Sequence, residues 1–381
     1  MKNMNALPLL TLVLLMTACG GGSDKKNEVI VPPVVTPPAV VEKPVVQGEI
    51  FGSFSTGTTA EPAFVYFDLE TQSVVELSTE EAANNSVWDI ALKRTGVYLN
   101  IHADNSVSAF DTGNNASFIG DDGKAIADSF INASAETELE GYLAITTADI
   151  PEDAAVFIKD VSSEILTGFY NYDHTTHVVS AATDNYFVVN SDQAFTKFRA
   201  KTLVTAGRTL SSITLGLAHQ SSTDSEFSAE IDLTIDAALV CSSDEDVYVD
   251  FAMQQLVTSA DSWDLHLPCT VDGDNKGGSF ALNIAEDALA FQDFTNNYAA
   301  IDPSAVAYYG FKKNQYMVKA FDDTPWYQYG VNGGHLLWSQ FNVYLIKTAT
   351  SVHKFQITSY YNEEGTSGHY SFRADEVIPA Q

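Results

Sequence analysis

The chain alternates apolar and polar residues over short runs, and this period of two predicts β-strands. In residues 86–101 (SVWDIALKRTGVYLNI), the two faces of the expected strand are Trp88, Ile90 and Leu92 against Asp89, Ala91 and Lys93. Two further runs flank a KTATS turn within residues 343–359. Long helical periods are lacking, and only residues 125–141 and 286–298 are short helix candidates. The pattern predicts a mainly β fold, with antiparallel β-sandwich-like sheets and a few short helices.

The chain also repeats itself. Residues 64–75 (FVYFDLETQSVV) align with residues 246–257 (DVYVDFAMQQLV), and a Trp-Asp pair follows in each copy. Further along, residues 169–198 align without gaps on residues 326–355. Both matches occur in the same order, which is typical of a duplicated unit. We therefore expect two tandem β domains, 48–220 and 221–381; a single domain with a large insertion is the alternative.

The N-terminus predicts export and lipid anchoring. Lys2 precedes the apolar run Ala6–Ala18, which has the length of a secretory signal and is too short to span a bilayer. The following Cys19 ends a sequence that resembles a bacterial lipobox, so residues 1–19 are expected to be a lipoprotein signal with Cys19 as the lipidated residue. Residues 20–47 are rich in proline and predict an extended tether. We expect the protein at the outer membrane, held by its lipid alone.

Charge and cysteine content narrow the chemistry. The net charge of −31 argues against nucleic acid, because phosphate binding needs clustered lysine and arginine. Apart from Cys19, the cysteines are Cys241 and Cys269, which in an oxidising compartment predict one disulfide. No GxSxG, P-loop, HExxH or Rossmann motif occurs, so we expect no enzyme.

Several motifs resemble those of a known family. FVYFDLET, SVWDIALKR, VYLIKTATSVHKFQITSYYN and GTSGHYSFR are similar to the opening and closing motifs of the HmuY family of bacterial haem-binding lipoproteins. The resemblance implies an all-β haemophore that passes haem to a TonB-dependent receptor. The family pattern is usually one domain, whereas here it is doubled. Family members differ in the side chains that hold iron, so the resemblance transfers no ligand pair.

The histidines are the candidate iron ligands. The chain has 8 histidines, and two of them, His174 and His177, lie in NYDHTTH at 171–177. The three steps between them reach only about 10 Å, too little to pass around a porphyrin, so one of them at most ligates a given haem. His335 follows a similar Tyr-x-Tyr pair in the second copy, one alignment position beyond His177. Two sites or one shared site are both open, as are solvated turn histidines.

Aromatic and basic residues near these histidines complete the candidate site. Tyr170 and Tyr172, and Tyr327 with Tyr329, alternate by two and would offer flat surface to a porphyrin, although half-buried strand aromatics show the same pattern. Lys197 and Arg199 are the cations expected to meet haem propionates.

Two functional hypotheses result. The first is a tethered haem-binding protein that takes haem, as cargo, from host haemoproteins and passes it to a TonB-dependent receptor. The second is a glycan-binding or adhesive surface lipoprotein in which exposed Trp326, Trp338 and tyrosines stack on sugars. If both hypotheses fail, the remaining interpretation is a structural envelope lipoprotein without a small ligand.

Overall fold

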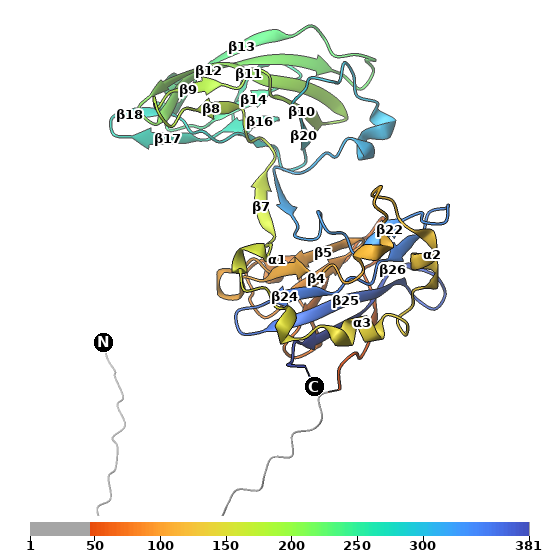
Figure 1. Ribbon diagram of the computed structural model, residues 1–381. Helices are drawn as coiled ribbons and strands as arrows, with labels where there is room; N and C mark the ends of the chain where they lie inside the picture. Colours follow the sequence, from red (N-terminus) through yellow and green to blue (C-terminus); the bar gives the residue numbers. More distant parts are fainter. Residues whose placement is uncertain (1–45, 381) are drawn as a thin grey trace, which may run out of the picture. The chain divides into compact units, whose positions relative to one another are not determined.

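The computed structural model describes residues 46–380, and the expected signal, lipobox cysteine and nearly all of the tether lie outside the described residues. The described fold is mainly β, as the sequence predicts. Its strands gather around two separate hydrophobic clusters. We call residues 46–160 with 319–380 the terminal lobe, and residues 161–318 the inserted lobe (Figure 1). No helix of the described chain is long and apolar enough to cross a membrane.

The terminal lobe contains two sheets and a hairpin. The five-stranded sheet has the order β1-β26-β25-β24-β6, with bounds Phe51–Ser55, Ser367–Glu376, Val352–Tyr361, Tyr344–Lys347 and Ser108–Asp111. The four-stranded sheet has the order β3-β2-β4-β5, with bounds Ser73–Val75, Val65–Asp68, Ile90–Lys93 and Gly96–Leu99. The hairpin pairs β22 (Tyr327–Tyr329) with β23 (Leu337–Ser339).

The inserted lobe repeats this plan. Its larger sheet contains the path β13-β12-β11-β10-β20, with bounds Ile231–Asp236, Thr209–Gln220, Ala194–Ala206, Tyr186–Ser191 and Leu289–Asp293. Two additional strands, β18 (Asn275–Gly278) and β17 (Cys269–Asp272), extend it from β12. The four-stranded sheet has the order β15-β14-β16-β19, with bounds Gln255–Val257, Val247–Asp250, Leu265–Leu267 and Asn283–Ile284, and the hairpin pairs β8 (Tyr170–Tyr172) with β9 (Val179–Ala181).

Short helices and one pair of strands complete the described chain. The α-helices are α1 (Thr79–Ala83), α2 (Ala127–Asn132), α3 (Leu139–Ala144) and α4 (Ala237–Cys241). The 3-10 helices are η1 (Ala103–Asn105), η2 (Ala116–Phe118), η3 (Thr147–Asp149), η4 (Ala154–Val156) and η5 (Pro303–Tyr308). The chain leaves the terminal lobe through β7 (Val161–Glu164) and returns through β21 (Gln315–Val318), and these two strands pair with each other.

Apart from β17 and β18, the two lobes are equivalent strand by strand, but neither lobe is one sequence copy. In strand order, β1 corresponds to β13, β6 to β20, and β24, β25 and β26 to β10, β11 and β12. The first copy supplies β1–β6 and β8–β12, yet β1 pairs with β26 and β12 pairs with β13. Each lobe is therefore built from the first half of one copy and the second half of the other.

The expected domains 48–220 and 221–381 do not follow the sheets for this reason. The predicted boundary falls between β12 and β13, which are antiparallel neighbours from Ser212↔Asp236 to Leu217↔Ile231. The connection between these strands spans residues 221–230 only, so they pair locally as a hairpin. The strand pairing corresponds to one domain that is interrupted in the chain by a large insertion. The inserted segment forms the second set of sheets.

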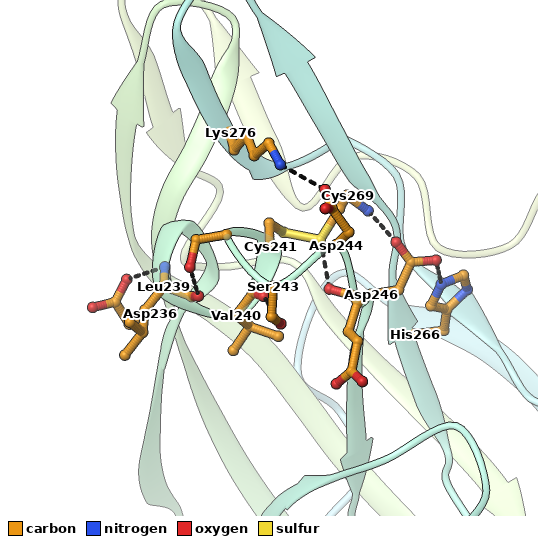
Figure 2. Close-up of a disulfide and its surroundings, with 12 residues drawn as sticks. Asp236, Leu239, Val240, Cys241, Ser243, Asp244, Asp246, His266, Cys269 and Lys276 are labelled. Carbon is orange, nitrogen blue, oxygen red and sulfur yellow. Dashed lines mark hydrogen bonds and ion pairs between the residues drawn. A yellow bond between two sulfur atoms is a disulfide. The ribbon is translucent and has the colours of Figure 1, made fainter.

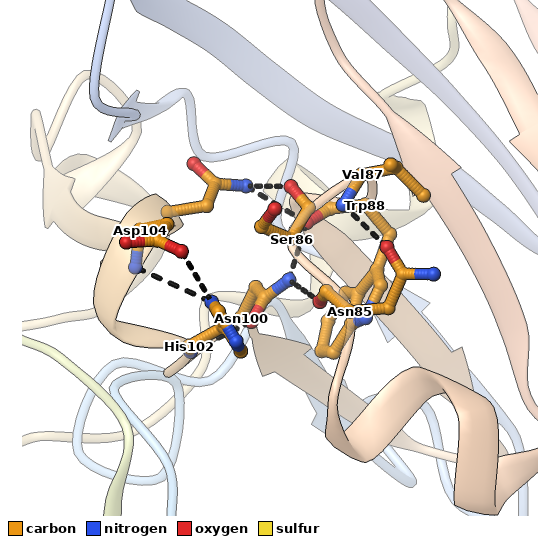
Figure 3. A network of polar contacts seen from close by, with 8 residues as sticks. Asn85, Ser86, Val87, Trp88, Asn100, His102 and Asp104 are labelled. Atoms are coloured by element: carbon orange, nitrogen blue, oxygen red, sulfur yellow. Dashed lines mark hydrogen bonds and ion pairs between the residues drawn. The ribbon is translucent and has the colours of Figure 1, made fainter. Parts of the chain in front are cut away.

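The repeated Trp-Asp pair closes the four-stranded sheet of each lobe in the same way. The Asp89 carboxylate accepts a hydrogen bond from Leu69 N at 2.8 Å, and the Asp264 carboxylate accepts one from Phe251 N at 2.7 Å. Burial raises the pKa of both carboxyl groups. In the terminal lobe, Asn100 Nδ2 donates to the carbonyls of Trp88 and Asn85 at 2.7 and 2.9 Å (Figure 3). The aspartate ahead of β4 or β16 thus caps the end of the neighbouring strand, β2 or β14.

Some predictions of single helices and strands are confirmed and others are wrong. The two runs around KTATS form β24 and β25, and residues 125–141 contain α2 and the first half of α3, as expected. The helix expected at 286–298 is wrong, because its apolar residues form β20 between β10 and a bridge to Lys312. Trp88 does not share a face with Ile90 and Leu92, because it precedes β4 and packs with Ala91.

Cys241 and Cys269 form the expected disulfide, which joins α4 to the start of β17 (Figure 2). Asp246 supports it, accepting a hydrogen bond from Cys269 N at 2.6 Å and lying 2.9 Å from His266 Nε2. The disulfide therefore belongs wholly to the inserted lobe.

Candidate functional site

The candidate histidines lie in the turns of two equivalent hairpins. His174 and His177 lie between β8 and β9, and His335 lies between β22 and β23. In each hairpin the last residue of the first strand is a tyrosine, with Tyr172 opposite Val179 and Tyr329 opposite Leu337. The sequence repeat therefore becomes a structural repeat at this position.

The turn of the inserted lobe is shaped by one aspartate. Asp173 accepts hydrogen bonds from Thr175 N at 2.7 Å and Thr176 N at 3.1 Å, and these backbone donors lower the pKa of its carboxyl. His177 then adopts a left-handed conformation, φ 57°, and its N–H donates to the Asp173 carbonyl at 2.8 Å. This backbone arrangement brings the imidazole back beside Tyr172.

Glycines shape the corresponding turn of the terminal lobe. Gly330, Gly333 and Gly334 have φ of 65°, 79° and 84°, in the left-handed region that favours glycine. Gly330 N donates to the Leu336 carbonyl at 2.8 Å, which closes the loop. This loop contains one more residue between tyrosine and histidine than the loop of the inserted lobe, and it has no aspartate.

Both turns nevertheless make the same side-chain contact. The Tyr172 hydroxyl lies 2.6 Å from His177 Nδ1, and the Tyr329 hydroxyl lies 2.5 Å from His335 Nδ1. Nε2 of each of these histidines has no hydrogen-bond partner within residues 46–380. Different turns and different loop lengths thus produce one Tyr-His pair in each lobe. The offset of one residue in the alignment is absorbed by the loop.

Each Tyr-His pair carries donor atoms suited to a metal. If Nδ1 carries the proton, it donates to the tyrosine and leaves the Nε2 lone pair available; if the tyrosine donates, its oxygen gains phenolate character. Imidazole nitrogen and tyrosine oxygen are both axial ligands of haem iron in proteins. No group of three or more His, Cys, Asp or Glu side chains within the described residues could hold a bare metal ion.

The Tyr-His pairs are exposed. Tyr172 is 43% and Tyr329 is 59% exposed, and both partner histidines are exposed as well. Four cavities of about 330 to 390 Å³ in the described chain are lined by other residues than these two pairs. The hairpin turns therefore present both Tyr-His pairs to solvent.

The other predicted tyrosines have a structural role. Tyr170 packs against the core of the inserted lobe, with its ring 5.0 Å from that of Phe280. Tyr327 packs in the terminal lobe, with its ring 4.8 Å from that of Trp326. The remaining candidate, His174, stands edge-on to Tyr172 at 4.9 Å between ring centres. Only the second tyrosine of each pair meets a histidine through its hydroxyl.

The predicted propionate cations are already engaged within the protein. Arg199 binds the Glu230 carboxylate through Nε and Nη2, both at 2.9 Å. Lys197 Nζ donates to Asn296 Oδ1 at 2.8 Å and to the Tyr298 carbonyl. A propionate would have to displace these partners, which the sequence could not reveal because Glu230 and Asn296 come from other segments.

A basic cavity lies in the terminal lobe instead. Its volume is about 360 Å³, and it is lined by the cations Lys93, Arg94 and Lys319 together with Tyr98, Trp326 and Tyr327. Lys319 pairs with Asp322 at 2.7 Å, and Lys93 Nζ lies over the Phe64 ring. In the sequence, Lys93 and Arg94 fit a role as propionate cations, but the family resemblance favoured a structural role for them. Their grouping with Lys319 could not be predicted, because Lys319 is far from them in the chain.

The tryptophans expected to bind glycans are enclosed. Trp326 is only 2% exposed, and its indole N–H donates to the Thr95 carbonyl at 3.1 Å. Trp338 is half-buried and its indole nitrogen is covered. The glycan hypothesis therefore loses the exposed indoles that it expected and keeps its exposed tyrosines.

Comparison with known proteins gives likenesses to solved structures only. A Tannerella forsythia apo HmuY analog is 12% identical, with 87% of this chain and 95% of that chain covered and a TM-score of 0.28. A Bacteroides vulgatus protein described as HmuY-like and heme-binding is 12% identical, with 84% and 86% covered and a TM-score of 0.23. The chain resembles HmuY-like proteins.

A third solved structure is a Bacteroides fragilis lipoprotein, 13% identical, with 47% of this chain and 94% of that chain covered and a TM-score of 0.15. No family model and no curated protein matches the chain. The HmuY-like resemblance seen in the sequence motifs thus recurs among the structures.

Proposed function

We propose that this protein is a tethered haem-binding protein that captures haem at the hairpins β8–β9 and β22–β23. The observation that supports this most is the repeated Tyr-His contact, Tyr172 with His177 and Tyr329 with His335. Two turns with different sequences and lengths retain one polar pair, at the only position where both hairpins expose donor atoms that haem iron accepts. The motif resemblance to a haem-binding family points to the same ligand.

Each hairpin would supply one axial donor, so the chain would take two haems. His174 and His177 are too close in the chain to hold opposite faces of one porphyrin. In the terminal lobe, the basic cavity is lined by Tyr327, two residues before Tyr329 on the same strand, and its Lys93, which has no hydrogen-bond or ion-pair partner among the described residues, would be the cation for a propionate. In the inserted lobe, Pro268 and Cys269 occupy the positions of Lys93 and Arg94, so we expect weaker binding there.

The biological setting belongs to the same proposal. A lipid on Cys19 and the tether 20–47 would hold the lobes at the outer membrane, where haem from host haemoproteins would be collected and passed to a TonB-dependent receptor. In this role the protein is a carrier and not an enzyme.

Haemin titration of residues 46–381, followed by the Soret absorbance, tests the proposal. We expect two sites of unequal affinity. His335→Ala should remove the tighter site and His177→Ala the weaker one, while His102→Ala, outside both hairpins, should change neither. A titration without any shift of the haemin spectrum would refute haem binding, and an unchanged stoichiometry in the double variant would refute the site.

A further inference from the structure

We propose that the basic cavity of the terminal lobe is a binding site for a small aromatic carboxylate, and that the equivalent place in the inserted lobe is not. This inference goes beyond the proposed haem binding, because the site needs neither iron nor the two Tyr-His pairs. Its ligand carries a negative charge at one end and a flat ring at the other.

The cavity gathers positive charge in an acidic protein. The chain has 19 lysines and arginines against 50 aspartates and glutamates, yet Lys93, Arg94 and Lys319 all line this volume of about 360 Å³. Lys319 is paired with Asp322 at 2.7 Å, whereas neither Lys93 nor Arg94 has a carboxylate partner within residues 46–380. Two cations thus lack a counter-charge at the cavity wall, and a bound anion would supply it.

Neutral groups hold these two cations in place. Arg94 Nη1 donates to the Gly57 carbonyl at 2.7 Å, and Nη2 lies 3.4 Å from the Ser367 hydroxyl. Lys93 Nζ lies 4.5 Å from the centre of the Phe64 ring. These contacts position the guanidinium and the ammonium without neutralising them. Their remaining N–H groups can donate to a carboxylate, which forms short, charge-assisted hydrogen bonds with both kinds of cation.

Aromatic rings form much of the remaining wall. Tyr98, Phe321, Trp326 and Tyr327 line the cavity, and such side chains stack favourably on a flat ring. The cavity volume lies near the lower end of the range of about 300 to 1,000 Å³ that is usual for small-molecule pockets. Size and lining therefore fit a carboxylate on a single aromatic ring. A bare inorganic anion would leave the aromatic walls unused.

The inserted lobe provides a comparison at the front of the cavity. Leu92 pairs with Val65 as Leu267 pairs with Val247, so Pro268 and Cys269 stand where the terminal lobe has Lys93 and Arg94. By the same register, Tyr98 opposite Ala91 corresponds to Asn283 opposite His266. In the inserted lobe, both cations and the tyrosine are thus replaced, and Cys269 is used for the disulfide.

The comparison extends to the residues behind the cavity. Ser359 pairs with Ser371 as Thr202 pairs with Thr214, so Tyr370 corresponds to Ile213. Tyr370 is fully buried, its ring lies 5.4 Å from that of Trp326, and its hydroxyl makes no hydrogen bond with described residues. An unpaired buried hydroxyl destabilises a core, and the isoleucine of the inserted lobe avoids that cost.

The differences between the lobes therefore gather at one place. Both lobes build the same sheets, so the fold does not require the charged and aromatic set of the terminal lobe. Trp326 belongs to this set, because its carbonyl accepts from Gln340 N as the Phe169 carbonyl accepts from Ala182 N. Binding of a ligand explains why polar and charged groups are kept in the terminal lobe where the inserted lobe has apolar residues and a disulfide.

Calorimetric titration of the full protein with benzoate, without haemin, tests the inference. We expect saturable binding of one benzoate, weakened by added NaCl because salt screens the attraction. Lys93→Gln should weaken binding about tenfold, since it removes a charged hydrogen-bond donor, and Lys93→Glu should abolish it. Lys347→Gln is the matched control, because Lys347 also lies over a phenylalanine ring of the terminal lobe, that of Phe157, but does not line the cavity.

Two further probes separate charge from ring. We expect benzyl alcohol and inorganic phosphate to bind more weakly than benzoate by about tenfold or more. Equal binding of benzyl alcohol would refute the role of the cations, and equal binding of phosphate would refute the role of the aromatic walls. Absence of benzoate binding would refute the site. Unchanged thermal unfolding of Lys93→Gln confirms that its effect on benzoate is local.

A parallel haemin titration identifies the source of the carboxylate. If Lys93→Gln weakens haemin binding and benzoate does not bind, the cavity serves only a haem propionate, so the inference fails while the haem proposal stands. If benzoate binds to a protein that shows no haemin spectrum, the inference is supported and the haem proposal fails.

Discussion

Asp160 Oδ1 accepts a hydrogen bond from Ala320 N at 2.8 Å, so the last residue before β7 holds the second residue after β21. Its other oxygen, Oδ2, accepts a hydrogen bond from Leu99 N at 2.9 Å. Asp160 is 4% exposed and therefore ties the departing chain, the returning chain and β5 together in the terminal lobe.

Burial raises the pKa of Asp160 to about 6, although both backbone donors oppose the shift. Because this folded-state pKa lies above the unfolded value near 3.8, the folded state holds the proton more tightly between these two values. The contribution of Asp160 to stability is therefore fully present below about pH 4 and is lost as pH rises through about 6. The loss amounts to about 3 kcal/mol.

Asp160→Asn should remove this dependence. The variant loses an acceptor and is less stable overall, but the difference between its unfolding free energy and that of the wild type should shrink as pH rises from 4 to 7. Urea unfolding at a series of pH values measures it. Asp121→Asn, at an exposed carboxyl, serves as the control and should run parallel to the wild type. A parallel curve for Asp160→Asn would contradict the expectation.

The disulfide should stabilise only the lobe that contains it. It closes a loop with a sequence separation of 28, and chain entropy predicts a loss of about 3 to 4 kcal/mol when both cysteines become serine. Native-state hydrogen exchange of Cys241→Ser with Cys269→Ser should show reduced protection in β11 and β12. The equivalent strands β25 and β26 have no such crosslink and provide the internal control, so an equal loss there would count against the prediction.

Two equivalent turns offer a matched test of backbone strain. Gln72 and Gln254 both adopt left-handed conformations, φ 52° and 55°, in which a side chain is unfavourable. The Gln72 side chain compensates by donating to the Ala374 carbonyl at 2.7 Å, whereas that of Gln254 makes no hydrogen bond with described residues. Gln254→Gly should raise the unfolding free energy by about 0.5 to 1 kcal/mol. Gln72→Gly should gain less or lose stability, and equal gains at both positions would show that the side-chain bond is unimportant.

The inserted lobe should fold by itself. Residues 161–318 contain its sheets, its main hydrophobic cluster and its disulfide. We expect this fragment to give a dispersed NMR spectrum and a cooperative thermal transition. The sequence copy 48–220 separates β12 from β13 and β1 from β26, so it should be markedly less stable. A fragment 48–220 as stable as 161–318 would show that the halves of one copy pair equally well.

The local pattern in the sequence was sufficient to predict the fold class and the internal repeat. Alternation around KTATS marked β24 and β25, and the Trp-Asp pairs marked equivalent turns, because these signals depend on neighbouring residues. The pairing between the halves of the two sequence copies could not be predicted, since β12 and β26 are equivalent partners for β1 by pattern alone. The ten-residue spacing of β12 and β13 decides this choice.

The candidate site was predictable in part for the same reason. The tyrosines and histidines of the two hairpins stand near each other in the chain, and the structure brings Tyr172 to His177 and Tyr329 to His335. Whether a cation is free or already paired depends instead on segments that are distant in the chain. Arg199 looked free in the sequence but is held by Glu230, and the basic cavity joins Lys93 to Lys319 across the whole insertion.

The pairing of β1 with β26 has a consequence for the order in which the protein matures. Synthesis runs from the N-terminus, so the inserted lobe has all of its strands well before the chain is finished. The first half of the terminal lobe must wait, with its edge strands unpartnered, until the final residues arrive. Truncation near the C-terminus would therefore damage the earliest part of the chain, far upstream of the missing residues.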